Sequence, residues 1–251
     1  MVAEPSRTAT TPRVETHALT PAMAELVSGI TAAVDASADP AQIAPAAAAA
    51  LRAALPAGAS LLTSGQCLPD CKRYCQHVAY VDPRGRFSVV SLVWLPGQVT
   101  PIHDHACWCV VGVVLGREEE TRFVPVGSEP AQDAKLRRTG QVHNEAGAVC
   151  WLIPAGSGRE VQTARTGPET PRTQGISPVS SGDIHQVRAV SDGVTISIHV
   201  YGDDIAARGS SIRRVYAEER LEVSGSAHPA PPAPADGAAR AGSATGPTVA
   251  G

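Results

Sequence analysis

The sequence has no hydrophobic run long enough to cross a bilayer, no apolar signal core and no excess of basic charge. Lysine occurs only at positions 72 and 135, a scarcity to which we attach no functional meaning. A formal net charge of -3 over 251 residues argues against nucleic-acid and anionic-membrane partners. The opening segment, MVAEPSRTATTPRVETHALT, differs from a signal peptide. We therefore expect a cytoplasmic protein.

The six cysteines also lack the spacing of common zinc sites. Cys67, Cys71 and Cys75 follow one another at intervals of four, which is not the CxxC pair of a zinc ligand set. In a reducing compartment we expect free thiols rather than a disulfide framework. We interpret the row as small buried residues, or thiols open to incidental oxidation, in preference to a second metal site.

Composition divides the chain into one domain with two loose ends. Residues 1–19 and 222–251 lack hydrophobic periodicity, and we expect both to be disordered. Residues 20–221 are expected to form a single domain. Within it, a helix is predicted to begin with Thr20 as its N-cap, and a second, alanine-rich helix over residues 40–55. We expect both helices to pack outside a later sheet.

From residue 87 onward the sequence is typical of short strands. The predicted strands cover residues 87–94, the HxH segment that begins at Pro101, and residues 107–115, 118–124, 147–153, 183–190 and 194–201. We interpret 118–124 as the hairpin partner of 107–115, with Gly116 at the turn. Residues 155–181, polar and rich in Gly and Pro, predict a long loop. Many short strands without helices between them indicate an antiparallel sandwich or barrel.

Two histidines lie one residue apart in the segment PIHDHACWCVVGVVLG. In a strand, His103 and His105 point to the same face, while Asp104 points to the other. Two imidazoles that converge from one strand can bind a divalent metal. A bare HxH pair is more simply explained as two satisfied polar histidines at a barrel mouth, but the other motifs of this chain favour the metal site.

A second polar array lies near the end of the predicted domain. In TISIHVYG, the side chains of Ser197, His199 and Tyr201 alternate with apolar ones, so they share one strand face. The polar outer face of an ordinary strand has the same pattern. Beside a set of metal-binding histidines, we interpret the row as a hydrogen-bonded array that orients bound oxygen and sets the protonation of a ligand.

The HxH segment resembles the first cupin motif, G(x)5HxH(x)3-4E(x)6G, with a cysteine in place of the usual glutamate ligand. The matching positions are Gly97, His103, His105, Cys109 and Gly116. The second motif, PxG(x)2H(x)3N, is echoed at Pro178, Gly182, His185 and Ala189, with one extra residue after the proline and alanine in place of asparagine.

The cupin resemblance implies an all-β core: a double-stranded β-helix barrel with the N-terminal helices packed outside. It also implies a metal held by His103, His105 and His185. Three neutral imidazoles leave the full charge of a dipositive ion uncancelled. We therefore expect this site to accept an anionic ligand, for example a thiolate.

Three segments together resemble the thiol dioxygenases, the cysteine dioxygenase group of cupins. They are WLPGQVTPIHDHACWCVVGVVLG, SGDIHQVRAV and ISIHVYG, in the family's order, within residues 74–216. The resemblance implies a mononuclear non-haem Fe(II) on the three histidines and catalytic roles for Ser197, His199 and Tyr201. It implies that a small thiol and O2 bind together and that both oxygen atoms end on sulfur, giving a sulfinate.

The substrate is inferred from the pattern Tyr74-Cys75-Gln76. It resembles the glutamine-type enzymes, which are associated with 3-mercaptopropionate, so we expect that thiol first and cysteine second. An amide is a weaker partner for a carboxylate than a guanidinium, so an arginine is also expected. In the glutamine type it comes shortly after the Tyr-Gly segment. Here we name Arg213 and Arg214, with Arg208 competing; a solvated surface arginine is the alternative for each.

Cys109 lies where animal cysteine dioxygenases carry a cysteine that crosslinks to the active-site tyrosine. We therefore hypothesise a thioether between Cys109 and Tyr201. A buried small thiol at this position explains the residue equally well.

Two other functions fit the same motifs. One is a cupin dioxygenase for an organic substrate without sulfur. The other is a non-catalytic cupin that binds a metabolite or a metal. The row of Ser197, His199 and Tyr201 argues against simple binding, which needs no such array. The sequence predicts a small thiol and O2 as partners, and it does not indicate an oligomeric state.

Overall fold

The computed structural model describes residues 13–14, 18–127, 134–154, 164–166, 183–218 and 221. Most of the two predicted disordered ends, and most of the predicted loop over 155–181, lie outside the described residues. Two short strands do fall within these segments: β1 (Arg13–Val14), which pairs in parallel with β2, and β9 (Ala164–Thr166), which pairs with β8.

Two helices begin where the sequence predicts them. In α1 (Pro21–Ala36), the Thr20 hydroxyl accepts a hydrogen bond from the backbone N–H of Met23 at 3.1 Å. In α2 (Pro40–Ala54), the Asp39 carboxylate caps the first turn through the N–H of Ala41 at 2.9 Å. Each cap satisfies a backbone donor that the first turn leaves unpaired. The predicted helices are therefore confirmed.

Within the described residues, twelve strands form two sheets. The larger has the order β1-β2-β3-β11-β5-β8-β9; besides β1 and β9, it contains β2 (Cys75–Val81), β3 (Ser88–Trp94), β5 (Cys109–Leu115), β8 (Val149–Leu152) and β11 (Thr195–Tyr201). The smaller has the order β12-β4-β10-β6-β7; its strands are β4 (Ile102–His105), β6 (Arg117–Val126), β7 (Lys135–Glu145), β10 (His185–Ala189) and β12 (Ile212–Tyr216).

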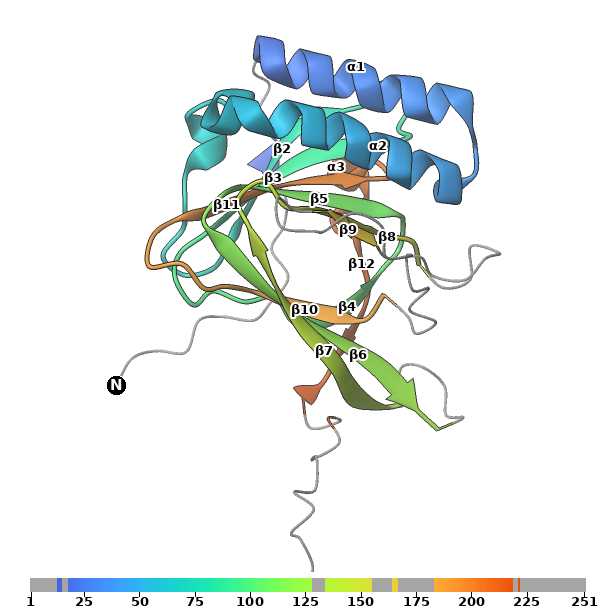
Figure 1. Cartoon of the computed structure of the whole chain (residues 1–251), viewed down its shortest axis with the longest axis vertical. Helices are drawn as coiled ribbons and strands as arrows, with labels where there is room; N and C mark the ends of the chain where they lie inside the picture. Colours follow the sequence, from blue (N-terminus) through green and yellow to red (C-terminus); the bar gives the residue numbers. More distant parts are fainter. Residues whose placement is uncertain are drawn as a thin grey trace, which may run out of the picture.

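The chain crosses repeatedly from one sheet to the other. β3, β5, β8 and β11 lie in the larger sheet, and β4, β6, β10 and β12 lie in the smaller one. All pairings except that of β1 with β2 are antiparallel. This winding of one chain through two facing antiparallel sheets is the double-stranded β-helix of the cupin fold, with both helices outside it (Figure 1). The predicted fold is confirmed.

The helices cover the outer face of the larger sheet (Figure 1). Their apolar stripes join that face in one core, in which the most buried large helix residues are Met23, Leu26, Ile30 and Leu51. A Cβ atom on Gly112 of β5 would lie 2.8 Å from Cδ2 of Leu51, so α2 can approach the sheet only because this position is glycine. With its outer face covered, β3 is buried along its whole length.

Three features differ from the sequence-based prediction. β6 is not the hairpin partner of β5, because the chain leaves Gly116 (φ 78°) for the other sheet and β6 pairs with β7 and β10. Strands β2, β7 and β12 were not predicted. The cysteine row is buried only in part: Cys67 ends a 3-10 turn and is half-buried, Cys71 is exposed, and Cys75 is buried at the start of β2.

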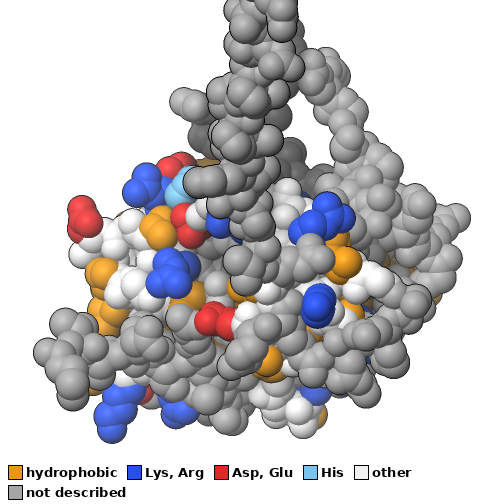
Figure 2. Space-filling model, turned by 90° about the horizontal axis from the view of Figure 1, so that it is seen from below, with side chains coloured by type: hydrophobic (Ala, Val, Ile, Leu, Met, Phe, Trp, Pro, Cys, Tyr) orange, Lys and Arg blue, Asp and Glu red, His pale blue; other side chains and the backbone are white. Residues whose placement is uncertain are grey.

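The remaining helical segments are short: η1 (Leu55–Leu61), η2 (Gly65–Cys67) and α3 (Ile205–Arg208). Among the described residues, no helix combines the length and hydrophobicity needed to cross a membrane. On the face shown in Figure 2, basic, acidic and hydrophobic side chains are interspersed.

Candidate metal centre

The three histidines of the two motifs meet inside the barrel. β4 carries His103 and His105 on one face, and β10 begins at His185, the direct cross-strand partner of His103. The ring centroids lie 4.7, 4.8 and 5.0 Å apart, and one ring nitrogen from each histidine lies within 4.8 Å of the others. All three side chains are buried. Such a cluster can hold a divalent metal ion.

On β4, Nδ1 of His103 has a hydrogen-bond acceptor, whereas Nδ1 of His105 lies near a carboxylate without forming a hydrogen bond among the described residues. His103 Nδ1 lies 2.9 Å from the carbonyl oxygen of Pro101. His105 Nδ1 lies 3.5 Å from Oδ2 of Asp183, and the same oxygen accepts a hydrogen bond from the backbone N–H of His105 at 2.6 Å. These contacts leave Nε2 of each ring free to bind a metal and fix the direction in which the ring faces.

His185 is held from β6, with an acceptor at Nδ1 as for His103. Its Nδ1 lies 3.0 Å from Oε1 of Glu120, and the Glu120 carboxylate accepts two hydrogen bonds from Arg122, at 3.0 and 2.9 Å. Burial alone would raise the pKa of Glu120, but the hydrogen bond from His185 and the charge of Arg122 lower it below its usual value. An ionised carboxylate therefore supports this histidine from behind.

Electrostatics favour the form of the histidines that binds metal. Burial lowers the pKa of His103 well below its usual value, and the neighbouring histidines lower it further. Burial also lowers the pKa of His105, against the opposing effect of Asp183. A neutral imidazole is the form that ligates a metal ion. The donor set, its burial and the oxygen atoms at Nδ1 therefore all fit a metal ion.

The polar row on β11 is hydrogen-bonded end to end. Oγ of Ser197 lies 3.1 Å from Nε2 of His199, and the phenol oxygen of Tyr201 lies 3.1 Å from Nδ1 of the same ring. Burial lowers the pKa of His199 to about 3, helped by the nearby histidines of the cluster. Burial raises the pKa of Tyr201 well above its usual value. A neutral imidazole thus joins a hydroxyl to a phenol, which is an arrangement able to relay a proton.

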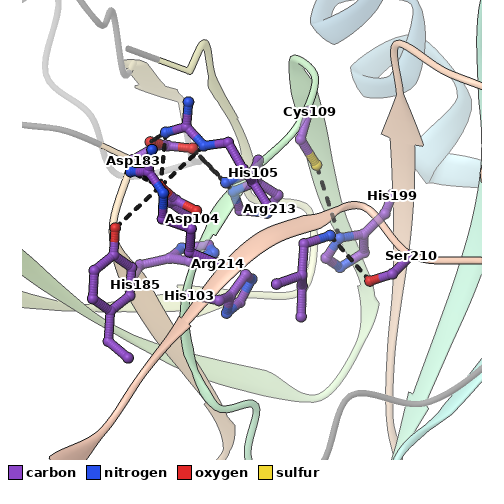
Figure 3. A network of polar contacts seen from close by, with 12 residues as sticks. His103, Asp104, His105, Cys109, Asp183, His185, His199, Ser210, Arg213 and Arg214 are labelled. Atoms are coloured by element: carbon purple, nitrogen blue, oxygen red, sulfur yellow. Dashed lines mark hydrogen bonds and ion pairs between the residues drawn. The ribbon is translucent and has the colours of Figure 1, made fainter. Parts of the chain in front are cut away.

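Cys109 lies directly opposite Tyr201 where β5 pairs with β11. Its Sγ atom is 4.0 Å from Nδ1 of His199 (Figure 3). Burial raises the pKa of this thiol well above its usual value, so it is protonated at neutral pH. The residue is not placed as a fourth metal ligand, since the cluster of possible ligands found among the described residues contains only the three histidines.

A cavity joins the histidine cluster to the polar row. Tyr74 and Trp94 stack with ring centroids 4.5 Å apart on one wall, and Gln76 lies beside them, buried. The other polar residues in the lining are Thr100, Glu118, Glu120, Arg122, Asn144, Cys150, Ser211 and the histidines and tyrosine described above. Gln76 is therefore placed where the sequence predicts a substrate contact.

The two arginines named from the sequence lie elsewhere. Arg213 and Arg214 do not line this cavity, and both bind Asp104, on the opposite face of β4 from the histidines, at 2.7 and 3.4 Å (Figure 3). Asp104 also accepts a hydrogen bond from Tyr216 and is 1% exposed. The guanidinium that lines the cavity belongs to Arg122.

Sequence reasoning missed the contribution of β6. In the segment REEETR, the side chains of Glu118, Glu120 and Arg122 alternate with outward-facing ones and line the cavity. Glu118 is 1% exposed, and burial with the nearby Glu120 raises its pKa to about 7, against a hydrogen bond with Ser197. The available signal was charged residues at alternate positions of a predicted strand, which places them on one face.

Comparison with known proteins adds little. No family model matches the chain. An RmlC-like cupin protein from Desulfovibrio desulfuricans is 21% identical over 53% of this chain and 86% of that one, with a TM-score of 0.28. A protein with a double-stranded β-helix domain from Klebsiella pneumoniae is 16% identical over 58% of this chain and 91% of that one, with a TM-score of 0.34. An oxalate oxidase is 14% identical over 53% of this chain and 46% of that one, with a TM-score of 0.29. Because these TM-scores are low, the fold assignment depends on the observed strand order and not on these matches.

Proposed function

We propose that this protein is an iron(II)-dependent thiol dioxygenase that converts a small thiol carboxylate, 3-mercaptopropionate or cysteine, and O2 into the sulfinate. One observation carries the proposal. The hydrogen-bonded row of Ser197, His199 and Tyr201 ends in the same buried cavity as a set of three histidines suited to a metal. A metal-binding barrel without a reaction would not need a phenol held on a neutral imidazole at its site.

The metal would be held by His103, His105 and His185 through nitrogens left free by the oxygen atoms at Nδ1. Iron(II) in that position would supply the redox chemistry and a common binding point for a thiolate and O2. The protein contributes orientation, since the backing of each imidazole fixes where open positions face. Burial of the cluster also excludes bulk water from a reactive sulfur.

The carboxylate of the substrate would be bound by Gln76 and Arg122. Both line the cavity, on β2 and β6, whereas Arg213 and Arg214 are engaged with Asp104. Arg122 already binds Glu120 through Nε and Nη2, which fixes its guanidinium plane and leaves further donors for a carboxylate. The stacked rings of Tyr74 and Trp94 offer an apolar wall for the short carbon chain.

Tyr201 would hold a proton at the cavity, on a phenol kept neutral by burial. Its partner His199 is also neutral, so the phenol and the imidazole can each donate or accept a hydrogen bond without creating a buried charge. We further propose a thioether between Cys109 and a ring carbon of Tyr201. Forming this bond would remove one hydrogen from the thiol and one from the ring, and O2 would take up both and be reduced to hydrogen peroxide. Peptide mapping after turnover tests it, and finding only unlinked peptides would exclude it.

Oxygen uptake by the iron-loaded protein tests the function. We expect uptake with 3-mercaptopropionate or cysteine, a lower rate with cysteamine, which has no carboxylate, and none with 3-hydroxypropionate, which has no sulfur. With isotopically heavy O2, both atoms should appear in the sulfinate. Uptake with non-thiols alone would show a different cupin dioxygenase, and no uptake with any substrate by the loaded protein would point to a binding protein. A cytoplasmic location stays a prediction.

A further inference from the structure

Glu118 is a buried carboxyl group that the proposed reaction does not use. It projects inward from β6, lines the cavity, and is 1% exposed. Among the residues that the structure describes, its Oε1 atom has no hydrogen-bond partner, and the Oδ1 atom of Asn144, its cross-strand neighbour on β7, has none either. A buried carboxyl oxygen without a partner is costly, which is a reason to look for a role.

The carboxyl group lies against the far end of the polar row. Glu118 interacts with the hydroxyl of Ser197, which in turn contacts Nε2 of His199 at 3.1 Å. At the other end of the row, Tyr201 contacts Nδ1 of that ring at 3.1 Å. The row therefore runs from a carboxyl through a hydroxyl and an imidazole to a phenol, which also contacts the hydroxyl of Ser211.

The ionised form of Glu118 allows one direction of hydrogen bonding. A carboxylate only accepts, so Ser197 donates its hydroxyl proton to Glu118. Oγ of Ser197 then accepts from Nε2–H of His199. The Nδ1 atom of the neutral ring is left as an acceptor, and Tyr201 donates its phenol proton to it.

The protonated form of Glu118 allows the reverse direction, because the carboxyl group can then donate a hydrogen bond. Glu118 donates to Ser197, and Ser197 donates to Nε2 of His199. The ring proton is then on Nδ1 and is donated to the phenol oxygen. The O–H of Tyr201 is then released from His199 and can donate to Ser211 on the cavity wall or into the cavity. The indole N–H of Trp94, 3.5 Å from Oγ of Ser197, donates in both states, and the serine oxygen has lone pairs for both.

We propose that Glu118 is a positioning residue whose protonation sets the direction of this hydrogen-bond row, and so decides whether Tyr201 donates its proton to His199 or into the cavity. The effect on turnover rests on the proposed function. The change in the tautomer of His199 does not rest on the proposed function, because it requires only that Glu118, Ser197, His199 and Tyr201 are in contact.

The surroundings of Glu118 suit a group that changes protonation near neutral pH. Burial is the largest effect on its pKa, followed by the opposing hydrogen bond with Ser197 and then by Glu120; together they place it at about 7. Among the described residues, the charged groups on the same face of its own strand are Glu120 and Arg122. The groups that face it from other strands are neutral: Asn144 on β7, Ala189 on β10, Ser197 and His199 on β11, and Trp94 on β3.

The tautomer of His199 tests the proposal directly. Nitrogen NMR of isotope-labelled histidine distinguishes Nδ1–H from Nε2–H in the full chain loaded with Zn²⁺, which is diamagnetic and binds imidazole. We expect Nδ1–H to predominate below a pH of about 7 and Nε2–H above it. In E118Q, which has no ionisable group at this position, the tautomer ratio should not change with pH. E119Q, a change on the outward face of the same strand, should behave as the unchanged protein.

A constant tautomer ratio in the unchanged protein, or the same pH response in E118Q, would overturn the proposal. If E118Q does not fold, the variant S197A tests the proposal instead, because it interrupts the row between Glu118 and His199. It should keep the infrared band of a protonated carboxyl group, which should titrate at a higher pH because the hydrogen bond that lowers the pKa of Glu118 is lost, and it should abolish the response of His199. A response that persists in S197A would contradict the proposal. If turnover occurs, kcat should fall as the pH rises through this range, and E118Q should lose that dependence. A tautomer change without thiol oxidation would reject the proposed function alone.

Discussion

Oε1 of Glu120 lies 3.0 Å from Nδ1 of His185, and this contact connects the metal centre to the wall of the cavity. The other side of the carboxylate binds Arg122 through two hydrogen bonds. One buried acid therefore orients a metal ligand and a cavity-lining guanidinium together. A change at Glu120 should affect both, although the residue itself is not a ligand.

We expect E120Q to reduce metal affinity about 10-fold to 100-fold, because the amide can accept from His185 but carries no charge to increase the basicity of the ring. Competition with a coloured chelator measures the affinity. E119Q, on the outward face of the same strand, is the matched control and should bind metal normally. Equal affinities for the two variants would show that Glu120 does not support the ligand.

H185A should abolish metal loading, because it removes one of the three donors and the only one contributed by β10 among the residues that the structure describes. Metal content per chain after reconstitution measures this directly. H143A changes a partly exposed histidine on β7 and serves as the control. Normal metal content and turnover in H185A would remove the ligand assignment.

Y201F should keep its metal and lose turnover. The phenol proton is held on His199, so its removal should reduce kcat by about 100-fold to 10,000-fold, as is usual for a positioned proton donor, with little change in KM. Y80F removes a phenol on β2 that packs against Phe87 outside the cavity, and its activity should be unchanged. Unchanged kcat in Y201F would mean that the phenol is a spectator.

The local features of this fold could be read from the sequence, because they depend on neighbours in the chain. The cap at Thr20, the alternation along β11 and the shared face of His103 and His105 are all short-range patterns. The meeting of His185 with His103 is a contact between distant strands. Only the resemblance to cupin motifs suggested it, and the pairing of β4 with β10 now accounts for it.

The features that the sequence analysis missed or predicted wrongly depend on contacts between strands that are distant in the chain. A turn at Gly116 is compatible with a hairpin or with a crossing between sheets, and the sequence alone does not distinguish them. Whether a charged strand residue faces solvent or the barrel depends on the sheet packed against it, so Glu118 and Glu120 were overlooked. The predicted substrate contact of Arg213 stays a prediction, but its observed partner, the buried Asp104, was expected to face outward for the same reason.

Asp82 should make stability fall at acidic pH. Its carboxylate is 4% exposed and binds Arg86 at 2.8 and 2.9 Å, which lowers its pKa from 3.8 to about 2. Because the folded pKa is the lower one, the stabilisation is complete above 3.8 and is lost as the pH falls toward 2. The shift corresponds to about 2 kcal/mol.

D82N should therefore lower the free energy of unfolding at neutral pH by about 2 kcal/mol and flatten its dependence on pH in the acidic range. Denaturant unfolding at a series of pH values measures both effects. D192N, a change at an exposed carboxylate, should leave the curve as it is. A D82N curve with the same acidic slope as that of the unchanged protein would assign the acid sensitivity to other groups.

Arg122 should distinguish thiols by their carboxylate. R122Q removes the guanidinium that lines the cavity, so KM for 3-mercaptopropionate should rise about 10-fold to 100-fold, the usual effect of losing a charged hydrogen bond. KM for cysteamine should change little, because it has no carboxylate, and this comparison separates lost substrate binding from lost metal, which would affect both thiols. R213Q should leave the ratio of the two KM values unchanged, since Arg213 binds Asp104 outside the cavity. If R213Q alters that ratio and R122Q does not, Arg213 rather than Arg122 binds the carboxylate, as the sequence predicts.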